Sequence, residues 1–407
     1  MKRIPLLTIV ISSLALFAAG KLSPATSLAA AEAARSRSFD FVYVAHVPAL
    51  PAGARTLRLW IPLPYEDAYQ SVASLRIESP VAYRIRREAE YGNRYAYLVI
   101  AGVRGRKPFD VRISFRATRF EHHVDVASVN DAPVPALATT ARFLQADRLV
   151  PTDGAIAELS GEQTQGATLP LDKARKIYDY VISTMRYDHD GSDWGRGDAL
   201  WTCQSKHGNC TDFHSLFIAM ARAAGIPARF EIGFPLPAAS TEGQIASYHC
   251  WAEFYVEGAG WIPVDASEAW KHKELKDYYF GSTDANRVMF TLGRDVRLNP
   301  PQQGDPLNYS VYPYAELDGK PFAGVRGEYS FRDARQFPIP LLPLPAENFP
   351  SAMGASAVSP APGRGWDRYR VGITDVWRAV NHREACRPAW YPTPRTSSRF
   401  FGLAHDD

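Results

Sequence analysis

Apolar and polar side chains alternate with a period of two through much of residues 38–130. The runs FDFVYVA (39–45), RTLRLWI (55–61) and FDVRISFRA (109–117) each place most of their apolar side chains on one face. This alternation is typical of half-buried antiparallel strands, and the Pro- and Gly-containing segments between the runs are typical of turns. The pattern predicts an all-β sandwich domain over residues 38–130.

The period changes to that of a helix beyond residue 169. LDKARKIYDYVISTM (171–185) carries apolar side chains at three- and four-residue steps, which predicts an amphipathic helix. A second helix is predicted from Cys210 to about Ala224, where Gly225 and the following Ile-Pro end it. Its side chains are apolar or small on nearly all faces, so we expect it to be buried almost all round.

Three strand-like runs follow the second helix. They are ARFEIGFPLP (228–237), ASYHCWAEFYVEG (246–258) and GWIPVDAS (260–267). A helix followed by strands of this kind predicts an α+β domain in which the helix packs on an antiparallel sheet. We assign this domain to residues 131–330.

The remaining parts of the chain lie at its two ends. Residues 331–407 contain a Pro-, Ala- and Ser-rich stretch that is typical of an unfolded tail. Residues 1–33 begin with Lys2 and Arg3, continue with an apolar run and end in an A-x-A motif, as a signal peptide does. The apolar run is shorter than the ~18–20 residues of a membrane span, which favours a cleaved signal over an uncleaved anchor. We therefore expect a periplasmic or secreted protein without a stable membrane span.

Composition excludes several classes of function. The 46 Lys and Arg residues nearly balance the 43 Asp and Glu residues, and no basic stripe is present, so nucleic acid is not an expected partner. The His and Cys residues lack metal-ligand spacing, and no cofactor motif is found. Four cysteines are too few for a disulfide framework, and the spacing does not decide whether Cys203 and Cys250 are bridged.

The stretch HGNCTDFHSL (207–216) places Cys210 in the first turn of the predicted helix. Asn209 can cap the helix, and Asp212 can complete a capping box. The positive end of the helix dipole would then stabilise a thiolate at Cys210, and Gly208 would let the chain turn sharply before it. A buried structural thiol is the alternative interpretation of Cys210 alone, but such a thiol would not need this setting.

A thiolate that transfers acyl groups needs a base, and the base needs a partner that orients it. His249 lies in one strand-like run and Asp265 in the next, after a tight turn, so the two would lie roughly across from each other. His214, four residues after Cys210 on the same helical face, is the alternative base. It has no obvious carboxylate partner in register, so we favour His249.

Taken together, these motifs resemble the core of the transglutaminase-like superfamily, which has a papain-like α+β fold. The family pattern is Gly-x-Cys opening a helix, Arg-x-x-Gly-Ile-Pro-Ala-Arg ending it, then His-x-Trp and Gly-Trp-x-x-x-Asp. This sequence matches it at residues 208–210, 222–229, 249–251 and 260–265.

The resemblance implies a catalytic triad of Cys210, His249 and Asp265. The backbone N–H of Cys210 is the natural first donor to an oxyanion. A tryptophan upstream of the nucleophile is a feature of the family, so Trp194 and Trp201 are candidates for the second donor or for the wall of the cleft. Gln204 is a third candidate, because its spacing from the cysteine is that of the papain-like glutamine.

The sequence therefore predicts an exported thiol enzyme that acts on an amide. Cys210 would attack the carbonyl and form a thioester, which water would resolve in a peptidase and an amine would resolve in a transamidase. The sequence does not choose between these outcomes. The resemblance favours peptide or protein substrates, with peptidoglycan stem peptides as one class. A catalytically silent binding or scaffold protein of the same fold is the alternative function.

Overall fold

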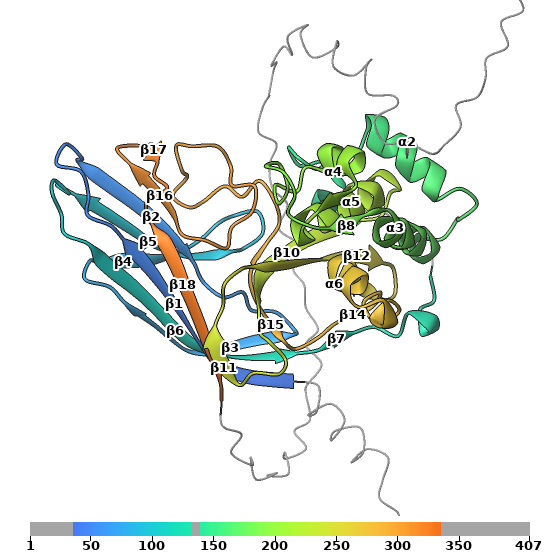
Figure 1. The fold of residues 1–407 in the computed structure, drawn as a ribbon, viewed down its shortest axis with the longest axis horizontal. Coiled ribbons are helices and arrows are strands. Elements are labelled where there is room, and N and C mark those ends of the chain that lie inside the picture. The colour runs from blue at the N-terminus through green and yellow to red at the C-terminus, as the bar shows by residue number, and fades with distance from the viewer. Residues whose placement is uncertain (1–35, 132–138, 335–407) are drawn as a thin grey trace, which may run out of the picture.

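The structure is a computed structural model that describes residues 36–131 and 139–334 (Figure 1). The predicted signal peptide, residues 1–33, lies outside the described residues, as does the predicted tail beyond residue 334. Both therefore stay predictions. No helix within the described ranges has the length and apolar character needed to cross a membrane.

Two five-stranded sheets form the sandwich, with strand orders β11-β18-β1-β6-β3 and β17-β16-β2-β5-β4. All their paired strands are antiparallel, and the inner faces bury alternate apolar side chains, as the period of two predicts. The first sheet contains β1 (Ser36–Val47), β3 (Gln70–Glu78), β6 (Phe109–Phe120), β11 (Glu242–Gln244) and β18 (Arg326–Asp333). The second contains β2 (Thr56–Pro62), β4 (Tyr83–Arg87), β5 (Arg94–Ala101), β16 (Tyr314–Leu317) and β17 (Lys320–Pro321).

The sandwich takes strands from both ends of the described chain, which corrects the predicted division. β18 pairs with β1, and β16 pairs with β2. Residues 314–333 therefore belong to the sandwich and not to the domain assigned to 131–330, and β18 runs past residue 330 into the predicted tail. The physical reason is that β1 and β2 would otherwise each present an unpaired edge. Period-two alternation identifies a strand but not the sheet that it joins.

The α+β core, predicted from the change of period, is confirmed. Its four-stranded antiparallel sheet has the order β13-β12-β10-β15, and helix α5 packs on β12 and β10. The strands are β10 (Ala228–Pro235), β12 (His249–Val256), β13 (Gly260–Val264) and β15 (Arg287–Leu292). The helices are α2 (Gly154–Gln163), α3 (Pro170–Thr184), α4 (Ala199–Ser205), α5 (Cys210–Ala223) and α6 (Ala266–Lys271).

Helix α5 is the centre of this core. Its residues are buried from Cys210 to Arg222, as predicted from the apolar residues on nearly all its faces. Gly225 adopts a positive φ of 82° just after the helix, and the N–H of Ile226 bonds back to the carbonyl of Ala221. This C-terminal cap directs the chain into β10, which lies directly beneath the helix.

The four-stranded sheet lies between the helices and the sandwich (Figure 1). On the sandwich side, the ring of Phe41 in β1 stacks on Phe115 with centroids 5.3 Å apart. The same ring contacts Phe234 of β10 at 5.8 Å and Phe290 of β15 at 5.6 Å. The sandwich and the four-stranded sheet therefore share one apolar core.

Replacing Phe41 with alanine is expected to lower the free energy of unfolding by about 3–5 kcal/mol, because it leaves a cavity where the two sheets meet. Urea denaturation followed by circular dichroism measures this loss. Ile85→Ala is the control: Ile85 lies on β4 and is 51% exposed, so its loss should cost less than about 1 kcal/mol. Equal costs for the two variants would contradict the shared core.

Candidate active site

The start of α5 is built as the sequence predicts. The Asn209 side chain accepts a hydrogen bond from the N–H of Thr211 at 2.9 Å, and the Asp212 carboxylate accepts one from the N–H of Asn209 at 2.9 Å. The capping box is therefore present. Gly208 has a φ of 145°, and a Cβ there would collide with the Asp212 carboxylate. Only glycine fits this approach to the helix.

Asp212 also ties the loop of residues 195–197 to the helix. Its carboxylate accepts hydrogen bonds from the N–H groups of Gly195 at 2.6 Å and Gly197 at 2.9 Å. Both glycines have positive φ, and a Cβ on Gly197 would collide with the side chains of Ser215 and Thr211. The loop therefore lies closely against the first turns of α5.

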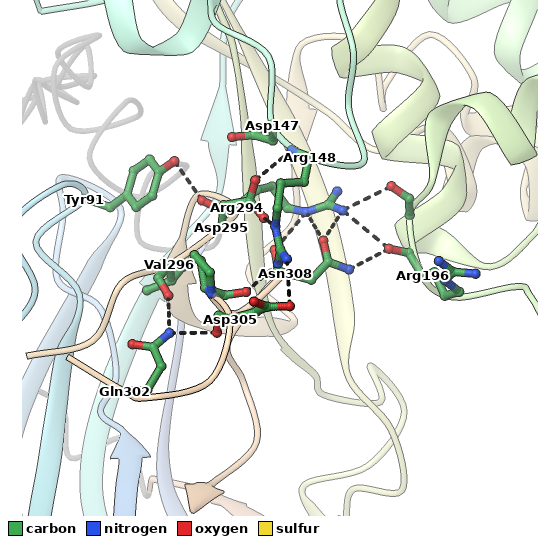
Figure 2. A network of polar contacts seen from close by, with 12 residues as sticks. Tyr91, Asp147, Arg148, Arg196, Arg294, Asp295, Val296, Gln302, Asp305 and Asn308 are labelled. Atoms are coloured by element: carbon green, nitrogen blue, oxygen red, sulfur yellow. Dashed lines mark hydrogen bonds and ion pairs between the residues drawn. The ribbon is translucent and has the colours of Figure 1, made fainter. Parts of the chain in front are cut away.

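A second buried side chain, Arg294, also holds this loop (Figure 2). Arg294 donates to the carbonyl of Gly197 at 3.1 Å and to the Ser215 hydroxyl at 2.6 Å. Asn308 accepts from the Nε of Arg294 at 2.9 Å and donates to the carbonyl of Arg196 at 2.6 Å. The segment that follows β15 thus fixes the loop that enters the site.

Cys210, His249 and Asp265 lie together where α5 meets the β12–β13 hairpin. His249 Nε2 is 2.7 Å from Asp265 Oδ2, and the His249 side chain also lies against the Cys210 thiol. Because Nε2 faces the carboxylate, Nδ1 is the nitrogen that faces the sulfur. The hairpin places Ala252 opposite Val264, so His249 and Asp265 come to the same end of it. Cys210 is 2% exposed, His249 6% and Asp265 0%.

The electrostatics of these three groups favour a thiolate next to an imidazolium. Burial lowers the pKa of His249, but Asp265 and Cys210 outweigh it and raise that pKa to about 10. Burial raises the pKa of Cys210, whereas hydrogen bonds to Cys250 and His249 hold it well below its usual value. Despite burial, His249 and Arg287 keep the pKa of Asp265 well below its usual range. At neutral pH the site therefore holds a nucleophile and a proton donor side by side.

His214, the alternative base, lies beneath the site. It is fully buried, and its Nε2 accepts a hydrogen bond from the N–H of Ala266 at 3.1 Å. Its Nδ1 faces the Cys250 sulfur at 3.6 Å. Burial lowers the pKa of His214, so the ring is neutral. Asp265 makes its short hydrogen bond to His249 and lies 3.6 Å from His214.

Cys203 and Cys250 differ in oxidation state. Cys203 is disulfide-bonded and Cys250 is a buried free thiol, so the bridge between Cys203 and Cys250 that the sequence left open is not formed. Cys250 hydrogen-bonds the Cys210 sulfur, and burial and the Cys210 charge raise its own pKa well above the usual value. Cys250 therefore stays a thiol and supports the negative charge on its neighbour.

Cys210 lies at a cleft of about 760 Å³. Its walls carry aromatic rings, among them Trp194, Tyr248 and Tyr312, and charged groups that include Lys271 and Glu268. The sulfur of Cys210 therefore has a path from solvent although its side chain is almost fully buried.

The three candidates for the oxyanion donor or the cleft wall are not equivalent. Trp194 lines the cleft, but its indole N–H donates to the carbonyl of Gly191 at 3.0 Å. Trp201 packs edge-on against His207, Gln204 is exposed, and neither lines the cleft. The physical reason for Gln204 is that α4 ends at Ser205 and Lys206 turns the chain through a left-handed conformation, so its spacing from Cys210 does not bring it to the cleft. Trp201, which the family resemblance suggested, lies on the same helix.

Two residues of the site were missed in the sequence. The Tyr248 hydroxyl accepts from Asn209 Nδ2 at 2.9 Å and lies 2.8 Å from the Thr211 hydroxyl. Its position next to His249 was a usable signal, because neighbours of a site residue often line the same cleft. Arg287 bonds Asp265 Oδ2 at 3.0 Å, and nothing local marks it, since it opens an ordinary apolar strand.

A metal site is not found in the part of the chain that the structure describes, because no three His, Cys, Asp or Glu side chains gather there in a suitable group.

Comparison with known proteins gives a family and a fold. The profile of the transglutaminase-like superfamily matches residues 157–266. An uncharacterized protein of Haemophilus influenzae is 31% identical over 310 aligned positions, and the match covers 67% of this chain and 84% of the relative. A crystal structure described as a candidate cysteine protease from Cytophaga hutchinsonii covers 74% of this chain and 92% of its own, with a TM-score of 0.50 and 17% identity. At that identity the likeness shows the fold alone.

The periplasmic domain of TgpA from Pseudomonas aeruginosa, bound to ethylmercury, is a more distant neighbour. It is 18% identical and covers 60% of this chain and 95% of its own. Its TM-score of 0.33 is too low to support an argument about this chain.

Iodoacetamide is expected to alkylate Cys210 at least about tenfold faster than Cys250 at pH 6, because only the former is a thiolate there. Peptide mass spectrometry after timed quenching measures both rates. His249→Ala should slow the labelling of Cys210, since the imidazolium that lowers its pKa is lost. Equal and slow labelling of both cysteines would show that the thiolate–imidazolium pair does not form.

Proposed function

Because this chain belongs to the transglutaminase-like superfamily, we propose that it is a thiol enzyme that cleaves or transfers the acyl group of an amide. The observation that carries the proposal is one line of three interacting side chains. It runs from the Cys210 sulfur through His249 to Asp265, and it lies at an open cleft.

In the proposed reaction, the Cys210 thiolate attacks the carbonyl carbon of the bound amide. The carbonyl oxygen becomes negative and lies near the first turn of α5, where the N–H of Cys210 and the helix dipole can stabilise it. His249 Nδ1 gives its proton to the departing amine, and a thioester remains on Cys210. Asp265 orients the imidazole and stabilises its charged form.

The second half of the reaction returns the enzyme to its starting state. Water or an amine attacks the thioester while His249 takes up the proton of the attacking group. The acid or the new amide leaves, and the Cys210 thiolate and the His249 imidazolium are restored. Whether hydrolysis or transfer prevails depends on which nucleophile reaches the thioester.

Peptide or protein amides are the proposed substrates. The cleft of about 760 Å³ is of the size that binds a small ligand or a short segment of peptide, and its aromatic walls can pack against peptide side chains. The signal-like sequence of residues 1–33 supports action outside the cytoplasm. Peptidoglycan stem peptides are one amide substrate class of the periplasm.

Reaction with p-nitrophenyl acetate is expected to release a burst of nitrophenolate equal to the enzyme concentration, since acylation of Cys210 precedes slower turnover. Stopped-flow absorbance measures the burst, and mass spectrometry finds the acetyl group on the Cys210 peptide. Cys210→Ala should abolish the burst. His249→Ala should slow it by about 10²–10⁴-fold, because the thiolate is no longer paired with an imidazolium.

Gln204→Ala is the matched control for these variants. Gln204 is exposed on α4 and does not line the cleft, so its loss should leave the burst rate within about twofold of the wild type. A burst that persists in Cys210→Ala, or an acetyl group on another residue, would refute the thioester. A folded wild-type protein that gives no adduct would favour the silent scaffold.

A further inference from the structure

The Asp265 carboxylate has a second cation against it besides His249. Arg287, the first residue of β15, donates from Nη1 to Asp265 Oδ2 at 3.0 Å. Its other terminal nitrogen donates to Asp284 Oδ2 at 2.8 Å. Arg287 is 2% exposed, and its guanidinium lies 4.8 Å from the centroid of the Trp251 ring. A buried arginine held on three sides has a fixed position.

Arg287 and His249 share one oxygen of this carboxylate. Oδ2 accepts from both, at 3.0 Å and 2.7 Å. The other oxygen, Oδ1, accepts from the Ser267 hydroxyl and from the N–H of Glu268, both at 3.1 Å. These last two bonds form the cap of α6 and hold the carboxylate in place without help from Arg287.

We propose that Arg287 is a positioning residue that takes up part of the negative charge on Asp265 Oδ2 and so limits how firmly His249 holds its proton. This inference rests on the proposed function, because it concerns the acid step of that reaction. A buried carboxylate without a second cation would bind the imidazolium alone and make it a poorer proton donor.

The groups that face His249 from the neighbouring elements are consistent with this role. Two of these groups lie on α5. The Cys210 thiolate helps Asp265 to keep His249 protonated, and His214 is neutral. From β12 itself come the Cys250 thiol and the Trp251 ring, whose centroid lies 6.1 Å from that of His249. The Asp265 carboxylate comes from the start of α6, with the Arg287 guanidinium behind it, and Glu268, Lys271 and Tyr279 line the same cleft.

The negative charge of Asp284 partly offsets the positive charge of Arg287. Asp284 lines the cleft, and burial raises its pKa, but the Arg287 charge lowers it overall. Charges therefore alternate from Asp284 through Arg287 and Asp265 to His249. Neutralising Arg287 should strengthen the hold of Asp265 on the imidazolium, and neutralising Asp284 should weaken it.

The pH dependence of Cys210 alkylation by iodoacetamide tests this alternation on the full chain. In the wild type the alkylation rate rises with pH in two steps. The step at lower pH occurs as the Cys210 thiolate forms beside the His249 imidazolium, and the step at higher pH occurs as His249 loses its proton. Arg287→Gln is expected to move the upper step to higher pH by about 0.5–1 unit. Asp284→Asn is expected to move it to lower pH, and Arg287→Lys, which keeps the charge, should shift it less than Arg287→Gln.

Opposite shifts in the two neutral variants would support the proposal, because a merely structural role would move both the same way. A downward shift in Arg287→Gln would mean that the arginine only holds Asp265 in place, and it would overturn the inference. If Arg287→Gln does not fold, the Asp284→Asn variant tests the proposal alone. An upper step at an unchanged or higher pH in that variant would contradict the proposal.

The same profile separates this inference from the proposed function. A wild-type Cys210 that titrates in one step like an ordinary thiol would refute the thiolate–imidazolium pair, and the role of Arg287 with it. A two-step wild-type profile that neither neutral variant changes would overturn the role of Arg287 alone.

Discussion

The hydrogen bond between His249 and Asp265 is the interaction on which the site depends. It is almost fully enclosed by protein, so the carboxylate acts on the imidazole with little screening by water. It raises the pKa of His249, and the charged ring in turn lowers the pKa of Cys210. Without this bond the ring would lose much of its preference for the charged form, and the sulfur would lose its partner.

The fold brings these groups together through three local devices. The capping box starts α5 at Cys210, the register of the β12–β13 hairpin sets the distance between His249 and Asp265, and Asp265 itself caps α6. The loop of residues 195–197 is then fixed by Asp212 from the helix and by Arg294 from beyond β15, and Figure 2 shows the contacts of Arg294. The sandwich supports the opposite face of the sheet through the Phe41 cluster.

Local patterns in the sequence predict the parts of this arrangement that depend on neighbours along the chain. The cap at Asn209, the buried helix α5 and the strands β10, β12 and β13 can be read from periodicity and from the residues that begin and end each element. A short turn between two strands also predicts that His249 and Asp265 lie near each other at one end of the hairpin.

The parts that the sequence did not predict depend on contacts between distant segments. The return of β16 and β18 to the sandwich leaves no local signal, because an alternating strand fits either sheet. Arg287 opens a strand and Arg294 lies in the loop that follows it, and no local motif marks either residue. Gln204 was misplaced because its spacing from Cys210 does not take account of the left-handed turn at Lys206.

Nitrogen NMR of the His249 ring tests the central claim most directly. In protein labelled with ¹⁵N-histidine, with His249→Gln used for assignment, both ring nitrogens should be protonated at pH 7 and should titrate near pH 10. Cys210→Ala should lower the pKa of His249, since the negative thiolate helps to keep the imidazole protonated. A wild-type His249 that is neutral at pH 7, with one ring nitrogen unprotonated, would contradict the account.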